Sequence, residues 1–296
     1  MATPPPEYIR DRLWGPNTAF PSFLGEFSLS LDNVVRNDSE PRWLTMGHLN
    51  LISWLAQSIF HGIPNGPTRD LLFGLLRHIY TSGCVGWLTA NAGFPMESRG
   101  IGRSLLETSW LFELGCEDPS YLQNWWHQMQ LPTGGRLRGK LLAHDRNRYG
   151  REKATAIDEA REEMYKEWSA GAHPSFFAII VPWEFDHENQ KSFMRFGRVT
   201  DEFAVRRGEE HFLMLIDAVA SICTQRAVAC FPDMPDREDL LPAMGMLQSA
   251  FLEFSKRIRE ELETPTVIDP AELSRYLRLW DDGTTVQAEK RREEKG

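Results

Sequence analysis

The stretch "PRWLTMGHLNLISWLAQSIFHGIPNGP" (residues 41–67) is the first part of the chain with a regular apolar period. Its apolar residues recur at helical steps: Leu44, Leu51, Trp54, Leu55 and Ile59. This spacing is typical of a helix that turns one face to a core, and the Gly- and Pro-rich end of the stretch stops it. The preceding sequence is rich in proline, so residues 1–40 are predicted to form an irregular wrap on a larger body.

Helical patterns continue along the chain. They predict further helices at residues 67–93, 96–114, 117–132, 134–150, 152–171, 200–229, 236–263 and 270–280. The runs "FFAIIV" (176–181) and "SFMRFGRV" (192–199) fit either two short paired strands or a buried loop-helix, because short apolar runs suit both. Helices outnumber strands, which predicts an all-α helical bundle with at most one short β-hairpin near 176–199.

The chain length allows one large domain or two small ones. We predict a single helical domain over residues 41–282. The last residues, 283–296, are dominated by charges and are predicted to be disordered.

Glycines have two predicted roles in the helices. Three of them lie inside the second helix, where a missing side chain permits close approach by a neighbour: Gly74, Gly83 and Gly86. Gly115 and Gly171 are predicted to close the third helix and the helix at 152–171, since glycine readily adopts the left-handed conformation that ends a helix. Asp118 or Ser120 is the expected N-terminal cap of the fourth helix.

The charge of the chain limits its function. There are 42 acidic and 33 basic residues, which give a formal net charge of −9. This charge argues against a protein that coats nucleic acid by general phosphate neutralisation, although a local basic face stays compatible with it.

The cysteines and the N-terminus indicate the compartment. The four cysteines form no Cys-x-x-Cys pair, so they are predicted to be buried, reduced thiols: Cys84, Cys116, Cys223 and Cys230. The N-terminus lacks the basic and apolar regions of a signal peptide, and the apolar run 176–181 is too short to span a bilayer. We therefore expect a cytoplasmic protein without a membrane partner.

The segment "YKEWSAGAHPS" (165–175) carries a histidine to the end of a helix. Pro174 disfavours helical conformation in the residue before it, so the helix is expected to stop at His173. Tyr165, Ser169 and His173 are four residues apart and lie on one helical face. One interpretation is a structural histidine that caps the helix C-terminus, where the partial negative charge favours a protonated imidazole.

The second interpretation needs a polar partner, and the third helix offers one. Arg99, Arg103 and Glu107 are spaced four apart in an otherwise apolar segment. A charge held in such surroundings must be paired, which predicts an Arg103–Glu107 ion pair. That pair either fixes helix register or meets His173, Tyr165 and Ser169 in one cleft, where an arginine, a carboxylate and an imidazole can handle a phosphate or a proton.

A basic run covers residues 136–153, "RLRGKLLAHDRNRYGREK". Its positive side chains are predicted to dock phosphates or an acidic protein surface, and the alternative is an ordinary solvated helix face. The residues assigned to binding are Arg136, Arg138, Lys140, Arg146 and Arg148.

The "RSLLE" helix together with "YKEWSAGAHPS" resembles a group of uncharacterised bacterial all-α proteins. Those have an Arg-x-x-x-Glu helix and a later Tyr-x-x-x-Ser-x-x-x-His segment, and they are distantly similar to the HEPN superfamily. The resemblance covers residues 70–230. It implies a helical bundle, often dimeric, that acts on RNA without a metal in a stress or phage-defence setting.

The resemblance assigns His173, Arg103 and Glu107 as the catalytic centre, with Tyr165 and Ser169 beside it. HEPN ribonucleases have an arginine a few residues before the histidine, and in that place this sequence has only Lys166 as a basic residue. Arg103 would then have to reach the site from the other helix. Literal Arg-to-His spacings occur elsewhere, at 206–211 and 138–144.

Other chemistries lack their motifs. We predict no metal site and no cofactor, because the histidines at 48, 61, 78 and 127 form no His-x-x-x-His or Glu-x-x-His pair and the sequence has no phosphate-cradling or nucleophile-elbow motif. Two functions remain from the sequence. One is an HEPN-like RNA-acting protein, and the other is a non-enzymatic interaction protein in which the same polar residues only lock the bundle.

Overall fold

The structure is a computed structural model that describes residues 40–128, 134–172, 183–186, 191–194 and 202–262. The predicted N-terminal wrap, the short helix near 270–280 and the charged tail lie outside the described residues, apart from Glu40. The chain divides into two compact units, Met1–Leu252 and Glu253–Gly296. The first unit holds almost all of the described structure, and in the second only the end of one helix is described.

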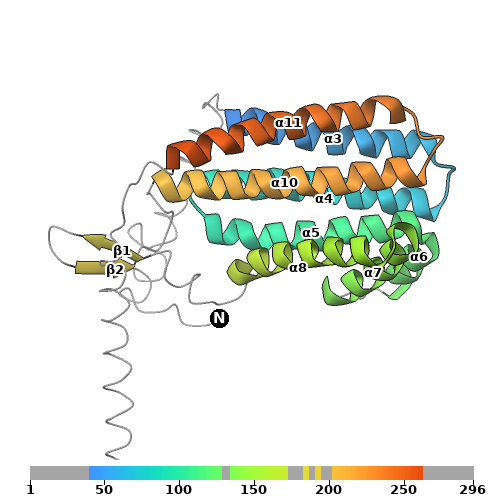
Figure 1. Ribbon diagram of the computed structural model, residues 1–296, viewed down its shortest axis with the longest axis horizontal. Coiled ribbons are helices and arrows are strands. Elements are labelled where there is room, and N and C mark those ends of the chain that lie inside the picture. The colour runs from blue at the N-terminus through green and yellow to red at the C-terminus, as the bar shows by residue number, and fades with distance from the viewer. Residues whose placement is uncertain (1–39, 129–133, 173–182, 187–190, 195–201, 263–296) are drawn as a thin grey trace, which may run out of the picture. The chain divides into compact units, whose positions relative to one another are not determined.

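Eight helices make up most of the described chain (Figure 1). They are α3 (Glu40–Gly62), α4 (Pro67–Asn91), α5 (Pro95–Glu117), α6 (Pro119–Gln128), α7 (Gly134–Tyr149), α8 (Arg151–Ala172), α10 (Glu202–Cys230) and α11 (Arg237–Leu262). The prediction of an all-α helical bundle is confirmed.

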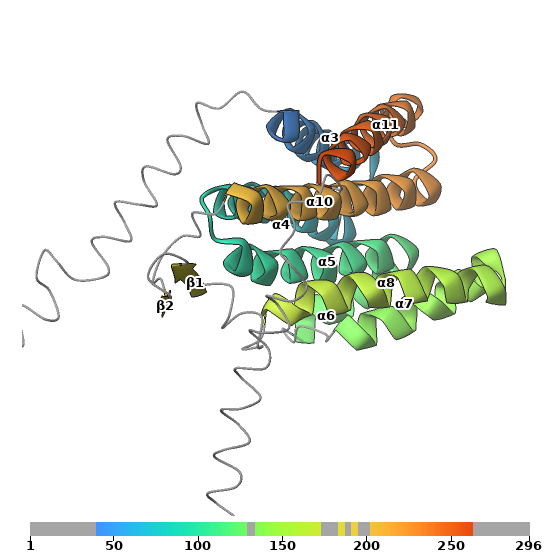
Figure 2. The same cartoon turned by 60° about the vertical axis from the view of Figure 1, so that its left-hand side comes forward.

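Helix α5 is central to the bundle. It packs against α4 and α10 on one side and against α8, α7 and α6 on the other. Figures 1 and 2 show α5 between the α4–α10 pair and the α7–α8 pair. Side chains on α5 therefore contact several helices that are far apart in the sequence.

The core lies among α3, α4, α5 and α10. The predicted apolar period of α3 is confirmed, because Leu44, Leu51, Leu55 and Ile59 are all buried. Trp54 is half-buried, and its indole Nε1 donates a hydrogen bond of 2.9 Å to the Asp236 carboxylate. Trp110, Phe112 and Phe212 are the largest fully buried side chains.

Two of the three glycines predicted to permit close helix contacts do so. A side chain at Gly86 would place its Cβ 2.2 Å from Cζ of Phe212, and one at Gly83 would place it 2.6 Å from Cδ2 of Leu49. Gly74 has no neighbouring atom within 4 Å of such a position, so the prediction for this residue is wrong.

Gly115 was predicted to end α5, but this prediction is wrong, because the helix continues to Glu117. A Cβ at Gly115 would lie 2.9 Å from Cδ2 of Leu122, so the glycine serves the close packing of α6 on α5. Asp118 begins α6 as its cap, since its carboxylate accepts hydrogen bonds from the Tyr121 amide at 3.1 Å and from the Ser120 hydroxyl at 2.5 Å.

Helix α8 runs through Gly171 and ends at Ala172, the residue before His173. Gly171 is thus inside the helix and not its predicted closing residue. The predicted end of the helix at the His-Pro step agrees with the last described residue of α8, while His173 and Pro174 themselves lie outside the described residues.

A small hairpin is the β structure in the described part of the chain. Strands β1 (Trp183–Asp186) and β2 (Lys191–Met194) pair antiparallel, with Trp183 opposite Met194. The second strand falls within the predicted run 192–199 except for its first residue. The first strand follows the run 176–181, which lies outside the described residues.

One helix has the length and apolar character of a membrane span. The segment Gly208–Cys230 of α10 meets that test, and 61% of its most apolar window is buried inside the protein. It packs against α3, α4 and α5, as the core helix of a bundle does.

Candidate functional site

The predicted Arg103–Glu107 pair is present on α5. Nε of Arg103 donates to Oε1 of Glu107 at 3.3 Å, and the two side chains are 25% and 30% exposed. Both residues lie on the side of α5 that faces α8, in a partly solvated position.

Tyr165 of α8 joins this pair. Nη2 of Arg103 donates to the Tyr165 hydroxyl at 2.7 Å, and that hydroxyl donates to Oε1 of Glu107 at 3.1 Å. The Arg103 guanidinium also lies 5.1 Å from the centre of the Tyr165 ring. We call Arg103, Glu107 and Tyr165 the α5–α8 triad.

Close packing of α5 and α8 holds the triad in place. Gly102 lies directly under the Trp168 ring, where a Cβ would come within 2.2 Å of Cε3. The rings of Tyr165 and Trp110 stack with centres 5.7 Å apart. The Tyr165 hydroxyl is therefore positioned by the packed interface below it and by Arg103 beside it.

Of the other two predicted members of the site, the structure describes Ser169 but not His173. Ser169 lies one helical turn after Tyr165, and its buried Oγ has no hydrogen-bond partner among the described residues. His173 lies outside the described residues, so its meeting with Arg103 stays a prediction.

The predicted basic binding residues do not act as one positive patch. Arg138 pairs with the Asp158 carboxylate at 2.9 Å and with Glu162 at 3.1 Å. The hydrogen bond that Arg138 donates to the Asp158 carboxylate is the main cause of a raised pKa of Arg138. Arg148 pairs with Glu117. Two of the five charges are thus offset by carboxylates, which the sequence run did not reveal.

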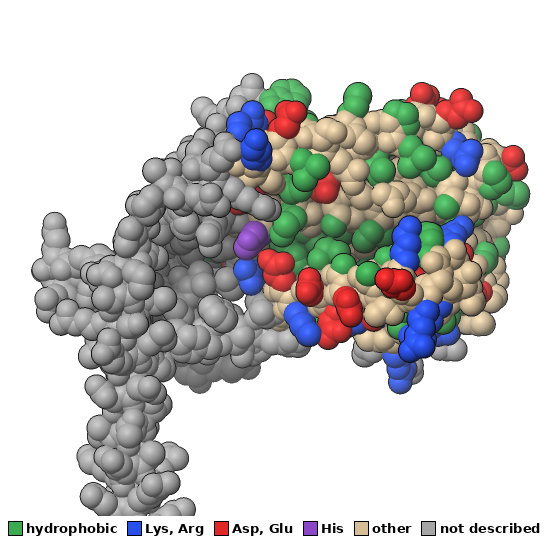
Figure 3. Space-filling view, viewed as in Figure 1, with side chains coloured by type: hydrophobic (Ala, Val, Ile, Leu, Met, Phe, Trp, Pro, Cys, Tyr) green, Lys and Arg blue, Asp and Glu red, His purple; other side chains and the backbone are tan. Residues whose placement is uncertain are grey.

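The other three residues assigned to binding are exposed: Arg136, Lys140 and Arg146. Nζ of Lys140 lies 4.5 Å from the centre of the Tyr121 ring, a cation–π contact between α7 and α6. Arg136 and Arg146 also lie on α7. In Figure 3, Asp and Glu side chains gather along the neighbouring α8, so the surface beside the triad has mixed charge.

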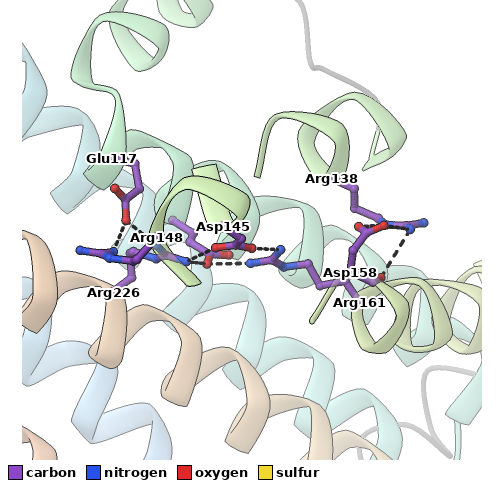
Figure 4. Close-up of polar contacts among 8 residues, drawn as sticks. Glu117, Arg138, Asp145, Arg148, Asp158, Arg161 and Arg226 are labelled. Atoms are coloured by element: carbon purple, nitrogen blue, oxygen red, sulfur yellow. Dashed lines mark hydrogen bonds and ion pairs between the residues drawn. The ribbon is translucent and has the colours of Figure 1, made fainter. Parts of the chain in front are cut away.

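A fully buried set of charges was not predicted. Glu113 of α5, Asp145 of α7, Arg161 of α8 and Arg226 of α10 meet inside the bundle, and we call these four residues the buried ring (Figure 4). Arg161 donates to Asp145 at 2.6 Å and to Glu113 at 2.8 Å. Arg226 donates to Asp145 at 3.1 Å and also bonds Glu113.

The buried ring balances its own charge. It has two arginines and two carboxylates, and Glu117 and Arg148 add one further charge of each sign at its edge. Burial lowers the pKa of Arg226, but the facing carboxylates of Glu113, Glu117 and Asp145 outweigh it and raise the pKa overall. Arg226 therefore stays charged, and the ring ties four helices together.

A signal for part of the ring was present in the sequence. Arg226 interrupts the apolar run "IDAVASICTQRAVAC" of α10, the same pattern that drew attention to Arg103. Asp145 and Arg161 had no such signal, because α7 and α8 are rich in charges and most of those charges are exposed.

Another buried polar pair joins α3 to α10. Nδ1 of His48 lies 2.7 Å from the Leu44 carbonyl oxygen, and Nε2 lies 2.9 Å from Oδ1 of Asp217.

The two literal Arg-to-His spacings each have one member in an ion pair. In the spacing 138–144, Arg138 pairs with carboxylates. In the spacing 206–211, Nδ1 of His211 lies 3.9 Å from Oε1 of Glu167. The side chain of Arg206 lies outside the described residues.

Among the described residues, no three or more His, Cys, Asp or Glu side chains are grouped as metal ligands. All four cysteines are free thiols, but only Cys116 and Cys223 are buried, while Cys84 and Cys230 are half-buried. Burial raises the pKa of both Cys116 and Cys223.

A surface hollow in the described structure lies at the start of α8, lined by Arg151, Glu152, Thr155, Ala156 and Glu159. It includes no member of the α5–α8 triad. Because one helix supplies all of its lining, it does not bring together side chains from different elements.

Comparison of the chain with known protein families, with curated proteins and with solved structures gives no match. The findings therefore support an all-α protein of eight described helices, and the function has to be inferred from the residues themselves.

Proposed function

We propose that the α5–α8 triad is the centre of a site that binds and acts on RNA, as the HEPN-like resemblance implies. The observation that carries the proposal is the 2.7 Å contact between Arg103 and the Tyr165 hydroxyl. It joins two motifs that are 62 positions apart in the sequence. Their chemistry, a guanidinium beside a hydroxyl and a carboxylate, suits a phosphodiester ligand.

Each member of the triad has a proposed role. Arg103 faces the phosphate, because the planar guanidinium donates paired hydrogen bonds to phosphate oxygens. Tyr165 orients Arg103 and offers its hydroxyl to the ligand. Glu107 is the nearest base, since its Oε1 already accepts a hydrogen bond from Tyr165.

The start of α7 supports an anionic ligand here. Gly134, the first residue of α7, lies against the Tyr165 ring, and no acidic residue occupies the first turn of this helix. The N-terminus of a helix carries a partial positive charge that favours a nearby anion. This contribution adds to Arg103 and does not replace it.

The proposed reaction is cleavage without a metal. A base, proposed to be Glu107, takes the proton of a ribose 2′-hydroxyl, whose oxygen attacks the adjacent phosphorus. The bond from phosphorus to the 5′-oxygen breaks, and that oxygen takes a proton from an acid, proposed to be His173. The products are a 2′,3′-cyclic phosphate and a 5′-hydroxyl, and Arg103 stabilises the negative charge that develops on the phosphoryl oxygens.

The test is degradation of a defined single-stranded RNA by the purified chain. We expect Arg103→Gln and His173→Ala to abolish cleavage while the thermal unfolding temperature stays close to that of the unmodified protein. Arg77→Gln on α4 is the matched control, because Arg77 is an exposed arginine far from the triad in sequence, and it should cleave normally. Equal cleavage by all four proteins would refute the proposal.

A second candidate is an interaction protein without activity. It is favoured by the carboxylates that offset Arg138, Arg148 and Arg103, because these arginines already have ion-pair partners inside the chain. In this case His173→Ala should lower stability by about 1–3 kcal/mol, typical of a lost buried hydrogen bond, and leave RNA intact. The partner would be an acidic protein or a second copy of the chain, and light scattering of the pure protein would detect the second copy.

A further inference from the structure

Gly134 lies closer to the Tyr165 ring than any other residue type could. A Cβ built at Gly134 would lie 2.7 Å from Cε2, 2.9 Å from Cζ and 3.1 Å from the hydroxyl oxygen of Tyr165. Real Cβ atoms essentially never come this close to ring carbons, so a side chain here must displace one of the two partners. Gly134 itself is buried.

The neighbouring glycines of α7 show that this contact is specific. Among the described residues, no atom lies within 4 Å of a Cβ position at Gly135 or Gly139, so none of them would meet an added methyl group there. Among the described residues, the packing against Tyr165 is what opposes a side chain at Gly134.

The displaced partner is expected to be the Tyr165 ring. Helix α7 packs along both α5 and α8, so moving its backbone would disturb many contacts. The ring is a side chain, and a small rotation moves its hydroxyl furthest. That hydroxyl contacts Arg103 and Glu107 at hydrogen-bond distance, and neither contact survives a large shift.

We propose that Gly134 is a positioning residue of the α5–α8 triad. By having no side chain, it lets the Tyr165 ring lie on the first turn of α7, so that the hydroxyl reaches both Arg103 and Glu107. Its effect on RNA rests on the proposed function. Its effect on Tyr165 rests on the packing alone and can be measured without RNA.

The experiment compares Gly134→Ala with Gly139→Ala, which adds the same methyl group to the same helix. Both replace a helical glycine by the better helix former, so neither should lose stability through helix propensity. In protein labelled with ¹³C at the tyrosine Cζ, we expect the Tyr165 signal to move in Gly134→Ala and to stay in place in Gly139→Ala. An unmoved signal in Gly134→Ala would overturn the proposal.

The activity measurement uses the same two variants. Misplacing a reacting group by about 1 Å can lower a rate on the order of 100-fold, so Gly134→Ala should lose most RNA cleavage while Gly139→Ala keeps it. In a Tyr165→Leu background, which also lacks the hydroxyl, the readout is the free energy of unfolding: Gly134→Ala should not lower it, because the clashing ring is gone. A loss of stability that persists in that background would mean that Gly134 acts through α7 itself, which contradicts the positioning role.

The two measurements separate the two proposals. If the unmodified protein leaves RNA intact and the Tyr165 signal still moves in Gly134→Ala, the proposed function fails and the positioning role stands. If RNA is cleaved and Gly134→Ala cleaves as fast as Gly139→Ala, the positioning role fails and the proposed function stands.

Discussion

Helix α5 carries two polar clusters that differ in their access to water. The α5–α8 triad uses Arg103 and Glu107 in the first part of the helix, where the side chains are 25% and 30% exposed. The buried ring uses Glu113, six residues after Glu107, where the Glu113 side chain is 4% exposed. Similar residue types therefore occupy opposite environments on one helix.

The difference teaches which charges can change partners. Taking charges out of water costs several kcal/mol per ion, and the buried ring offsets this cost only while its carboxylates and arginines stay together. The triad is half-solvated, so water or a ligand can replace one of its contacts at a smaller cost. The ring is suited to holding four helices in register, and the triad is suited to binding.

The largest expected effect comes from breaking the buried ring. Arg161→Met removes the guanidinium that bonds Asp145 and Glu113 and leaves two buried carboxylates short of positive charge. We expect a loss of about 3–5 kcal/mol in the free energy of unfolding, measured by urea denaturation.

Arg146→Met on α7 is the control for this loss. Arg146 is exposed, so its replacement should change the free energy of unfolding by no more than about 0.5 kcal/mol. Equal stability of the two variants would mean that the ring does not differ from the surface charges.

Replacing the whole ring by apolar residues should have a smaller effect and the opposite sign. The change combines Glu113→Leu, Asp145→Leu, Arg161→Met and Arg226→Met. Well-packed apolar groups in place of a buried ionic cluster are neutral or stabilising by about 1–4 kcal/mol. Urea denaturation of the fourfold variant measures this, and a loss as large as that of Arg161→Met alone would show that the ring itself provides stability.

Asp118, the cap of α6, is a charged residue next to Glu117 at the edge of the buried ring. The hydrogen bond from Ser120 is the main cause that lowers the pKa of Asp118. A carboxyl group with a lowered pKa in the folded state stabilises the fold above its unfolded pKa, and this contribution is lost as pH falls through the folded pKa. Asp118→Ala should lose about 1 kcal/mol at neutral pH.

The pH dependence gives the check on this cap. The difference in unfolding free energy between Asp118→Ala and the unmodified protein should shrink once the pH falls below about 4, the ordinary range for an aspartate. A difference that stays constant down to pH 2 would contradict a role for the ionised carboxylate.

The triad should give the smallest effect on stability. Arg103→Gln and Tyr165→Phe each remove a partly exposed polar contact, and we expect each to cost less than about 1 kcal/mol in the free energy of unfolding. The same urea series measures this. If either variant lost as much free energy of unfolding as Arg161→Met, the triad would have a structural role like that of the buried ring.

Much of the fold was predictable from local patterns. The apolar period of α3 and the Asp118 cap both depend on neighbouring residues, and both are confirmed. The Arg103–Glu107 pair was predictable for the same reason, because its members are one turn apart on one helix.

The sequence did not indicate contacts in which a residue packs against or pairs with a side chain on another helix. Gly115 was predicted to end α5, yet it is a contact point for Leu122 on the next helix. Arg138 was assigned to a binding patch, and the basic run did not reveal that it pairs with Asp158 of α8. Neither partner can be identified from the residues that precede or follow in the chain.

The sequence by itself determined the helices and their order. These features follow from spacing along the chain, since a helix repeats every 3.6 residues whatever surrounds it. Only the tertiary structure decided which charges are buried. Glu113, Asp145, Arg161 and Arg226 come from four helices, and a charge becomes part of a buried ring only when packing removes water from all of its members at once.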